Sequence, residues 1–350
     1  MTNLGSNDTG FSLQEYLPPS TQPVRGMLYG IAGRVFLIES LDEWSALAVS
    51  KLFAGWFVTP LSPNGRTPDS TIRVRCGSVA PQIPAGLDRF AVAGGGFCHT
   101  NGRTVYIELD GSLVVIPPFQ APLVDVWMRT RYDFSSWILA QVFAQAFAAA
   151  LRRCGLFLLH SAGVRPPKHD NALLIAGESG SGKTTLTCQL ASRGWGYLSD
   201  DSMVLASGQH GVEAQGLRRF FALTEATMAA VQLRKDSSDP KGNGIKTRLA
   251  PQDVFPAGQI ASAQIGAILF PAITQRPQSR MVRLSPSDVM ARLLRFCPWA
   301  CYDKPTATSY LGLLGQLARQ TLAFDLFSGK DLLGDPDLTV DLILAALEDR

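Results

Sequence analysis

The chain contains, at residues 171–205, the stretch NALLIAGESGSGKTTLTCQLASRGWGYLSDDSMVL. An apolar run at 173–176 predicts a strand that is buried on both faces. Residues 177–184 then match the pattern G-x-x-x-x-G-K-[ST] at every position. Glycines let such a loop turn its backbone N–H groups toward phosphate oxygens, and the following helix adds its positive N-terminal end. The stretch therefore predicts a nucleotide site in an α/β fold.

Side chains of this loop are the expected ligands of the nucleotide and its metal. Lys183 is expected to reach the β- and γ-phosphates, and the Thr184 hydroxyl to ligate Mg²⁺. ATP and Mg²⁺ are thus the predicted cofactors. The predicted nucleotide-binding residues are Gly177, Glu178, Ser179, Gly180, Ser181, Gly182, Lys183, Thr184 and Thr185.

Two adjacent carboxylates follow the loop. A helix is expected over 184–192, a strand over 195–198, and Asp200 and Asp201 come directly after that strand. One helix and one return strand bring the chain back toward the phosphates, where Mg²⁺ needs oxygen ligands. One carboxylate can hold the metal, together with Thr184, while its neighbour accepts a proton from an attacking hydroxyl. The alternative is a polar turn in which one carboxylate caps a nearby group.

Composition narrows the classes of partner. The 350 residues are 46% hydrophobic and 17% charged, with a net charge of +3, which is too small to favour a nucleic-acid or membrane partner. The N-terminal sequence lacks the basic and apolar segments of a secretory signal, and no apolar run reaches the length of a membrane span. Six cysteines without paired spacing argue against structural zinc and favour reduced thiols in the cytoplasm.

The pattern along the chain divides it into three parts. Residues 1–20 are expected to form a flexible N-terminus, 21–135 a smaller β-rich region, and 136–350 the α/β nucleotide-binding domain. The expected strands of the β-rich region are 35–38, 71–75, 105–109 and 113–116, with a helix near 42–52 and hairpin turns at Asn101-Gly102 and Asp110-Gly111.

The nucleotide-binding domain is expected to continue with alternating helices and strands. A helix is predicted over 137–153, strands over 156–159, 216–220 and 265–270, a helix beginning at Ser285-Pro286, and an amphipathic helix over 337–348. The 216–220 strand is expected to line the site. Residues 235–243 resemble a mobile loop, and Lys246, Arg248 and Arg276 are cations available for phosphates or an acidic substrate.

Three segments together resemble the HPr kinase/phosphorylase family: the residues around His160, the loop with Gly177, Gly180, Gly182 and Lys183, and the pair Asp200-Asp201. They look closest to HPr-kinase-related proteins encoded beside peptide-modification gene clusters. The family shares its P-loop nucleotide-binding core with ATP-dependent phosphoenolpyruvate carboxykinase. The resemblance covers mainly 156–206 and, more loosely, 136–340.

The resemblance implies roles for these residues. His160 occupies the place of a family histidine on the strand before the loop, where it contacts phosphate or orients an aspartate. One of Asp200 and Asp201 would activate a serine hydroxyl and the other would help to place the metal. Asp200, Asp201, Lys183 and His160 are therefore the predicted catalytic residues. Relatives that form hexamers or smaller rings imply a homo-oligomer.

The chain also departs from the family. The family has an acidic residue where Thr185 stands, and 243–246 are only distantly similar to the segment associated with dephosphorylation. The β-rich region does not match the family's regulatory domain. HPr is therefore an unfavourable acceptor, and the candidates are a ribosomal precursor peptide, another protein or a small molecule, with the β-rich region as a possible acceptor- or partner-binding part.

Three functions compete. The first is a Mg²⁺-dependent kinase acting on a hydroxyl, with serine favoured. The second is a small-metabolite P-loop kinase, although such enzymes are short and begin near their loop, whereas 176 residues precede Gly177 here. The third is a non-catalytic ATP-binding regulator, which tight ATP binding without phosphoryl transfer would reveal.

Overall fold

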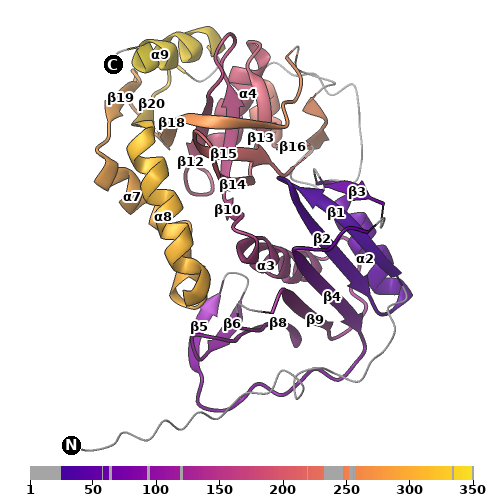
Figure 1. The fold of residues 1–350 in the computed structure, drawn as a ribbon. Helices are drawn as coiled ribbons and strands as arrows, with labels where there is room; N and C mark the ends of the chain where they lie inside the picture. The colour runs from indigo at the N-terminus through magenta and orange to yellow at the C-terminus, as the bar shows by residue number, and fades with distance from the viewer. Residues whose placement is uncertain are drawn as a thin grey trace, which may run out of the picture.

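The computed structural model describes residues 25–56, 58–62, 65–92, 95–118, 121–218, 220–231, 247–251, 255, 257–332 and 335–348. These residues form a mixed α/β structure with two large sheets and several helices (Figure 1). The flexible segment predicted at 1–20, the loop predicted at 235–243 and Lys246 lie outside the described residues.

The N-terminal sheet has nine strands in the order β3-β1-β2-β4-β9-β8-β7-β6-β5. Its strands β2, β4 and β9 pair in parallel, and the others pair antiparallel. The strands are β1 Arg25–Ile31, β2 Arg34–Ser40, β3 Thr59–Leu61, β4 Ser70–Cys76, β5 Asp88–Val92, β6 Gly96–Thr100, β7 Val105–Leu109, β8 Ser112–Ile116 and β9 Leu123–Met128.

Turn chemistry sets the hairpins of this sheet. Asp110 and Gly111, with φ of 48° and 70°, connect β7 to β8, because asparagine, aspartate and glycine tolerate the left-handed region that a two-residue hairpin turn requires. The four strands and the helix predicted for this region are confirmed. The helix is α2, Glu43–Phe53, and Asp42 caps it by accepting a hydrogen bond from the Ser45 N–H.

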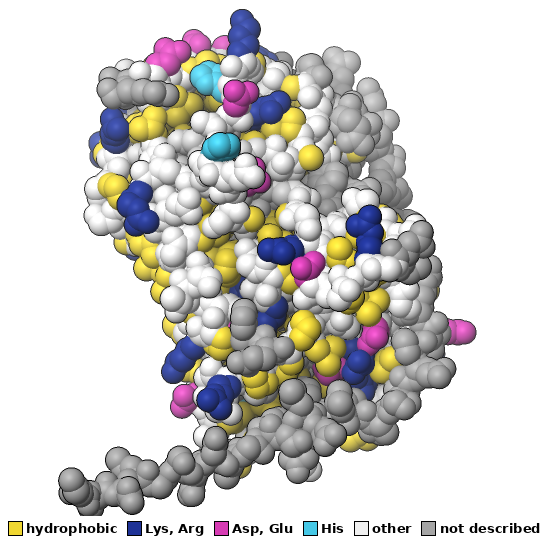
Figure 2. Space-filling model, in the orientation of Figure 1, with side chains coloured by type: hydrophobic (Ala, Val, Ile, Leu, Met, Phe, Trp, Pro, Cys, Tyr) yellow, Lys and Arg dark blue, Asp and Glu magenta, His cyan; other side chains and the backbone are white. Residues whose placement is uncertain are grey.

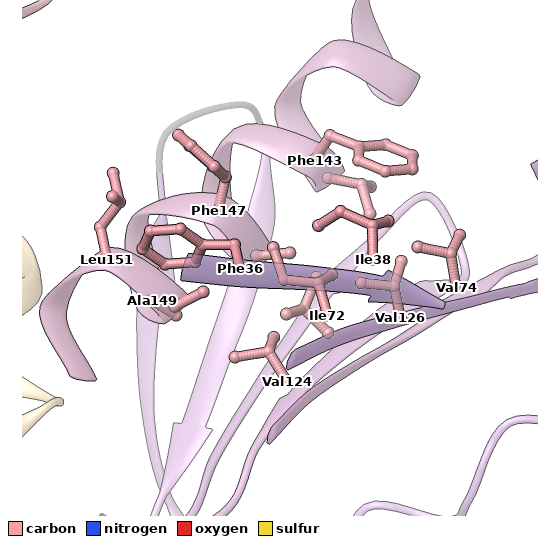
Figure 3. Close-up of a cluster of buried hydrophobic side chains, with 14 of the residues drawn as sticks. Phe36, Ile38, Ile72, Val74, Val124, Val126, Phe143, Phe147, Ala149 and Leu151 are labelled. Atoms are coloured by element: carbon pink, nitrogen blue, oxygen red, sulfur yellow. The ribbon is translucent and has the colours of Figure 1, made fainter. Parts of the chain in front are cut away.

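Helix α3, Trp137–Arg153, covers one face of the N-terminal sheet, and its bounds are those predicted. Phe143, Phe147 and Leu151 of α3 meet Phe36 and Ile72 of the sheet in one buried cluster (Figure 3). Apolar residues recur along α3 at the spacing of one helical face, so the helix can bury that face on the sheet. The buried cluster of the N-terminal sheet therefore includes residues of α3 as far as Leu151.

The second sheet also has nine strands. Seven follow the order β10-β14-β15-β18-β12-β11-β13, while β20 pairs with β18 and β19 pairs with β20. The strands β12, β18 and β20 pair in parallel. The strands are β10 Phe157–Leu159, β11 Ser161–Arg165, β12 Ala172–Ala176, β13 Gly196–Ser199, β14 Met203–Gly208, β15 Gly211–Gly216, β18 Ser262–Ile273, β19 Arg280–Arg283 and β20 Leu322–Ser328.

Helices cover both faces of this sheet, which is why β12 is apolar at every position. Leu173 and Ile175 pack with α4 (Lys183–Ser192) and α9 (Pro336–Glu348). Leu174 faces the other side, with α7 (Pro286–Leu294) and α8 (Lys304–Gln320). The remaining elements are the pair β16 Phe221–Leu223 and β17 Thr247–Leu249, helix α5 Glu225–Ala230 and the 3₁₀ turn η1 Pro298–Cys301.

Most of the elements predicted for the second half are confirmed, and one prediction is wrong. Ser285 caps α7 in a capping box with Asp288, and Pro286 is at the start of the helix, as the sequence predicted. The strand predicted at 216–220 is not formed: Gly216 is the last residue of β15, β16 begins at Phe221, and the described residues Leu217, Arg218 and Phe220 lie outside both strands.

The two halves are joined by a buried charge cluster at the end of α3. Asp303, fully buried before α8, accepts hydrogen bonds from Arg152 Nε at 2.9 Å and from an Arg153 guanidinium nitrogen at 3.2 Å. A buried carboxylate between two arginines is costly to separate, so this cluster fixes α3 against the second sheet. Among the described residues, no helix has the length and apolar character needed to span a membrane.

Candidate active site

The glycine-rich loop 177–182 connects β12 to α4 at one edge of the second sheet. Gly182 caps α4 with a φ of 95°, a left-handed conformation that a residue with a Cβ adopts only with strain. Because Gly182 provides the first helical acceptor, taking the Leu186 N–H at 2.9 Å, the loop ends on the N-terminus of α4. The exposed N–H groups of a helix N-terminus form a site suited to anions.

Lys183 lies at the base of this loop and is only 6% exposed. Its ammonium donates hydrogen bonds to the carbonyl oxygens of Gly177 at 2.6 Å and Glu178 at 2.9 Å. These hydrogen bonds to backbone carbonyls hold the ammonium in place at the base of the loop, next to the start of α4.

The two threonines after the lysine differ in their surroundings. Thr184 is half-buried in the first turn of α4. The Thr185 hydroxyl lies 3.2 Å from that of Thr227, which in turn lies 3.0 Å from that of Thr224, the N-cap of α5. Thr185 thus connects α4 to α5, whereas Thr184 is the hydroxyl expected beside a metal.

Asp200 is buried directly after β13, with 1% of its surface exposed. Its Oδ2 accepts the Ala222 N–H at 3.1 Å, and its Oδ1 is buried without a hydrogen-bond partner among the described residues. Burial raises the pKa of Asp200 to about 6, and the adjacent Asp201 adds to the rise while Arg218 opposes it. Asp200 is a carboxylate with one oxygen still in need of a positive partner.

Asp201 is more accessible and is paired on both oxygens. Its Oδ1 lies 3.1 Å from His160 Nδ1 and its Oδ2 lies 2.6 Å from the Arg218 guanidinium. The exposed fractions of the three side chains are 45% for His160, 24% for Asp201 and 33% for Arg218. The two adjacent aspartates therefore have different environments, one closed and one open to an incoming molecule.

The charge on His160 follows from its neighbours. Burial lowers the pKa of His160, and the cations Lys183 and Arg218 lower it further, while Asp201 acts in the opposite direction. The lowered pKa favours the neutral imidazole at neutral pH, and a neutral imidazole has one ring nitrogen able to accept a proton. Lys183 of the loop thus affects the pKa of His160, which lies beside Asp201.

The segment from Gly216 to Ala222 lies against the aspartates. A Cβ at Gly216 would meet the Leu198 carbonyl oxygen at 1.9 Å, so only glycine allows this approach of the two backbones. The Leu217 N–H donates to the Ser202 carbonyl at 3.0 Å, and Ala222 donates to Asp200. Leu217, Arg218 and Ala222 therefore lie beside Ser202, Asp201 and Asp200.

Of the residues singled out from the sequence, His160 and Asp201 are in contact and Asp200 adjoins Asp201; Arg218, which was missed, pairs with Asp201. The signal available for Arg218 was its place two residues after Gly216, within a segment expected to line the site.

The other two described cations singled out from the sequence, Arg248 and Arg276, lie on different segments of the second half. Arg248 is on β17 opposite Ala222, with its guanidinium 4.6 Å from the centre of the Phe220 ring. Arg276 lies in the connection between β18 and β19, where its carbonyl accepts the Lys330 N–H at 2.9 Å. Arg248 is thus near the segment beside the aspartates, whereas Arg276 belongs to a different connection of the second sheet.

Whether the residues of the candidate site suit Mg²⁺ depends on the carboxylate of Asp200. The described residues include no group of three or more His, Cys, Asp or Glu side chains that could hold a metal ion. Mg²⁺ at phosphoryl-transfer sites needs only one or two protein carboxylates, since substrate phosphates and water supply the other oxygens. The unpartnered, buried Oδ1 of Asp200 is an atom that a cation would satisfy, so the residues present fit this metal.

Charges elsewhere are mixed. On the face seen in Figure 2, the described Lys and Arg side chains are interspersed with Asp and Glu, consistent with the net charge of +3.

A comparison with models of known protein families finds no match to this chain, and none of the curated proteins matches it. The resemblance of the sequence to the HPr kinase/phosphorylase family therefore stays a prediction that depends on the residues of the site.

Proposed function

We propose that this chain is an ATP- and Mg²⁺-dependent kinase of the HPr-kinase-like type, with a P-loop core, that transfers the γ-phosphoryl group to a hydroxyl. The observation that carries the proposal is the combination of a buried lysine in a glycine-rich loop with two adjacent aspartates in unlike environments. Phosphoryl transfer depends mostly on positioning and charge neutralisation, and this combination can supply both.

We assign the glycine-rich loop to the binding of ATP, the phosphoryl donor. Backbone N–H groups at the start of α4 and the Lys183 ammonium would bind the phosphates of ATP. Mg²⁺ would be held by Asp200 and the Thr184 hydroxyl, and when bound it neutralises charge on the phosphates. Asp200 suits this role because an ion can reach a buried oxygen that a bulky acceptor cannot.

We assign Asp201 and His160 to the part of the site that meets the hydroxyl acceptor of the phosphoryl group. The acceptor's oxygen forms a bond to the γ-phosphorus, while the bond from that phosphorus to the β,γ-bridging oxygen breaks and leaves its electrons on ADP. The hydroxyl proton passes to the His160–Asp201 pair. Asp201 is one-quarter exposed and the lowered pKa of His160 favours its neutral form at neutral pH, so the pair can meet an acceptor and take its proton.

The favoured acceptor is a serine hydroxyl of a ribosomal precursor peptide or another protein, and HPr is not favoured. Thr185, which stands where relatives have an acidic residue, is occupied in hydrogen bonding Thr227 and is unsuited to replace a carboxylate. The proposal places the enzyme in the cytoplasm, as a homo-oligomer, where ATP and new peptides are available.

The test is direct. Purified protein with Mg²⁺ and ATP labelled in the γ-phosphoryl group is incubated with serine peptides, small hydroxyl compounds and HPr. Label on a peptide or protein, lost in Asp201→Asn while ATP binding is retained, supports the kinase. Label only on a small metabolite favours a small-metabolite kinase, and tight ATP binding without transfer or hydrolysis favours a non-catalytic regulator.

A further inference from the structure

Arg218 links the site to the N-terminal region. Its side chain is paired with Asp201 Oδ2 at 2.6 Å, and its backbone forms an antiparallel β-bridge with Trp56. Trp56 belongs to the short connection after α2, in the N-terminal half of the chain. Arg218 therefore contacts the carboxylate of Asp201 with its side chain and the N-terminal half of the protein with its backbone.

Trp56 is firmly anchored. Its ring lies 4.7 Å from that of Phe147 on α3 and 5.3 Å from that of Phe53 on α2, measured between ring centres. Aromatic contacts of this kind are among the strongest available to a packed core. The backbone of Trp56 is thus fixed by the same cluster that holds α3 on the N-terminal sheet.

Two further contacts hold the segment around Arg218. The Ala32 N–H, in the turn between β1 and β2, donates to Gln215 Oε1 at 3.0 Å. A Cβ at Gly55 would lie 2.8 Å from an atom of the Phe220 ring, so the two chain segments approach closely there. The N-terminal region therefore touches the segment on both sides of Arg218.

We infer that Arg218 is a positioning residue through which the docked N-terminal region sets the orientation of Asp201. This inference rests on the proposed function, because it assigns Asp201 to the acceptor side. With its backbone fixed by Trp56, the guanidinium holds Oδ2 and directs Oδ1 toward His160. The N-terminal region is then part of the acceptor site and does more than recruit a partner.

A purely structural role for this ion pair is unfavourable. Arg218 is 33% exposed and Asp201 24% exposed, and ion pairs in contact with water contribute little to folding stability. A small misplacement of a reacting group, in contrast, can lower a rate about 100-fold. Loss of Arg218 should therefore be visible in the rate of transfer and not in the melting temperature.

The first test compares variants in the phosphoryl-transfer assay. Arg218→Gln is expected to lower kcat about 10- to 100-fold with the KM for ATP within about twofold, and Arg218→Lys to restore part of kcat because it keeps a charge. Trp56→Ala should lower kcat in the same direction, and the double variant should be no worse than Arg218→Gln alone.

Matched controls come from the same chain. Arg193→Gln removes an arginine of similar exposure, 39%, from an ion pair with Asp337 on α9. Trp44→Ala removes a tryptophan that stacks on Phe134 within the N-terminal half. Both controls should keep kcat within about twofold of the unmodified protein, because both changes lie away from the proposed reacting groups. An unchanged kcat in Arg218→Gln, or a loss that Arg218→Lys does not relieve, would overturn the inference.

The second test needs no activity, so it separates failure of the inference from failure of the proposed function. Amide hydrogen exchange is measured without ATP in the peptide covering residues 51–56. Exchange there should be faster in Arg218→Gln and Asp201→Asn than in the unmodified protein, and unchanged in Arg193→Gln. Equal exchange in all four proteins would show that Asp201, Arg218 and Trp56 are not linked, whether or not the protein transfers phosphate.

Discussion

Nδ1 of His160 lies 3.1 Å from Oδ1 of Asp201, a contact that joins residues on either side of the glycine-rich loop and α4. The contact distinguishes Asp201 from Asp200, whose Oδ1 has no hydrogen-bond partner among the described residues. Two neighbours in the sequence thus have different chemical roles available to them, and the predictions below use that difference.

Asp200→Asn and Asp201→Asn should respond differently to Mg²⁺. Asp200→Asn is expected to raise the Mg²⁺ concentration needed for half-maximal activity at least about tenfold, because an amide binds the ion more weakly than a carboxylate. Asp201→Asn should lower kcat about 100-fold or more with a nearly unchanged Mg²⁺ requirement. Mg²⁺ titrations of initial rates check this, with the exposed Asp341→Asn on α9 as the control. Indistinguishable titrations would remove the division of roles.

Lys183→Ala should abolish phosphoryl transfer, with a loss of about 1,000-fold or more, because it removes the cation nearest the predicted phosphate position. Lys330→Ala, at an exposed lysine, is the control and should have the activity of the unmodified protein. Initial rates and ATP binding by calorimetry provide the measurements. A rate near normal in Lys183→Ala would refute the assignment of the loop.

Two glycine-to-alanine variants should change stability in opposite directions. Gly182 has a φ of 95°, so Gly182→Ala should lower the free energy of unfolding by about 1–2 kcal/mol and weaken ATP binding. Gly312 lies in α8, where a Cβ would have open space around it, so Gly312→Ala should raise that free energy by about 0.5–1 kcal/mol. Urea denaturation checks both signs, and a stabilised Gly182→Ala would contradict the loop conformation.

The raised pKa of Asp200 predicts a dependence of stability on pH. Burial raises the pKa to about 6 in the folded protein, above its value in the unfolded chain. The folded state therefore binds the proton more tightly, and this contribution is present at low pH and is lost as pH rises through about 6.

Asp200→Asn cannot ionise and should not suffer this loss. Relative to the unmodified protein, the variant should gain up to about 3 kcal/mol of stability between pH 4 and pH 7 in the absence of Mg²⁺. Denaturation at several pH values measures the difference. A difference that does not change with pH would mean that Asp200 ionises as easily in the folded protein as in the unfolded chain.

Much of the local structure could be predicted from the sequence because short-range chemistry controls it. Asp110-Gly111 specifies a tight hairpin turn, and Ser285-Pro286 with Asp288 specifies a helix start. The apolar residues 173–176 predict a strand covered on both faces, and the structure has helices on both sides of it.

Packing decided features that local patterns could not predict. The apolar face of α3 could cover either sheet, and it covers the N-terminal one because Phe143 and Phe147 fit against Phe36 and Ile72. Leu217 is expected in a strand, yet it lies outside β15 and β16, and its N–H donates to the Ser202 carbonyl.

The sequence by itself determined the glycine-rich loop, its lysine and the adjacent aspartates, since these depend on residue types at fixed local spacing. The tertiary structure alone decided which aspartate is buried and which is open, and it brought Arg218 from one half of the protein into contact with Trp56 from the other. Burial and long-range pairing depend on how distant segments pack, and no local pattern contains that information.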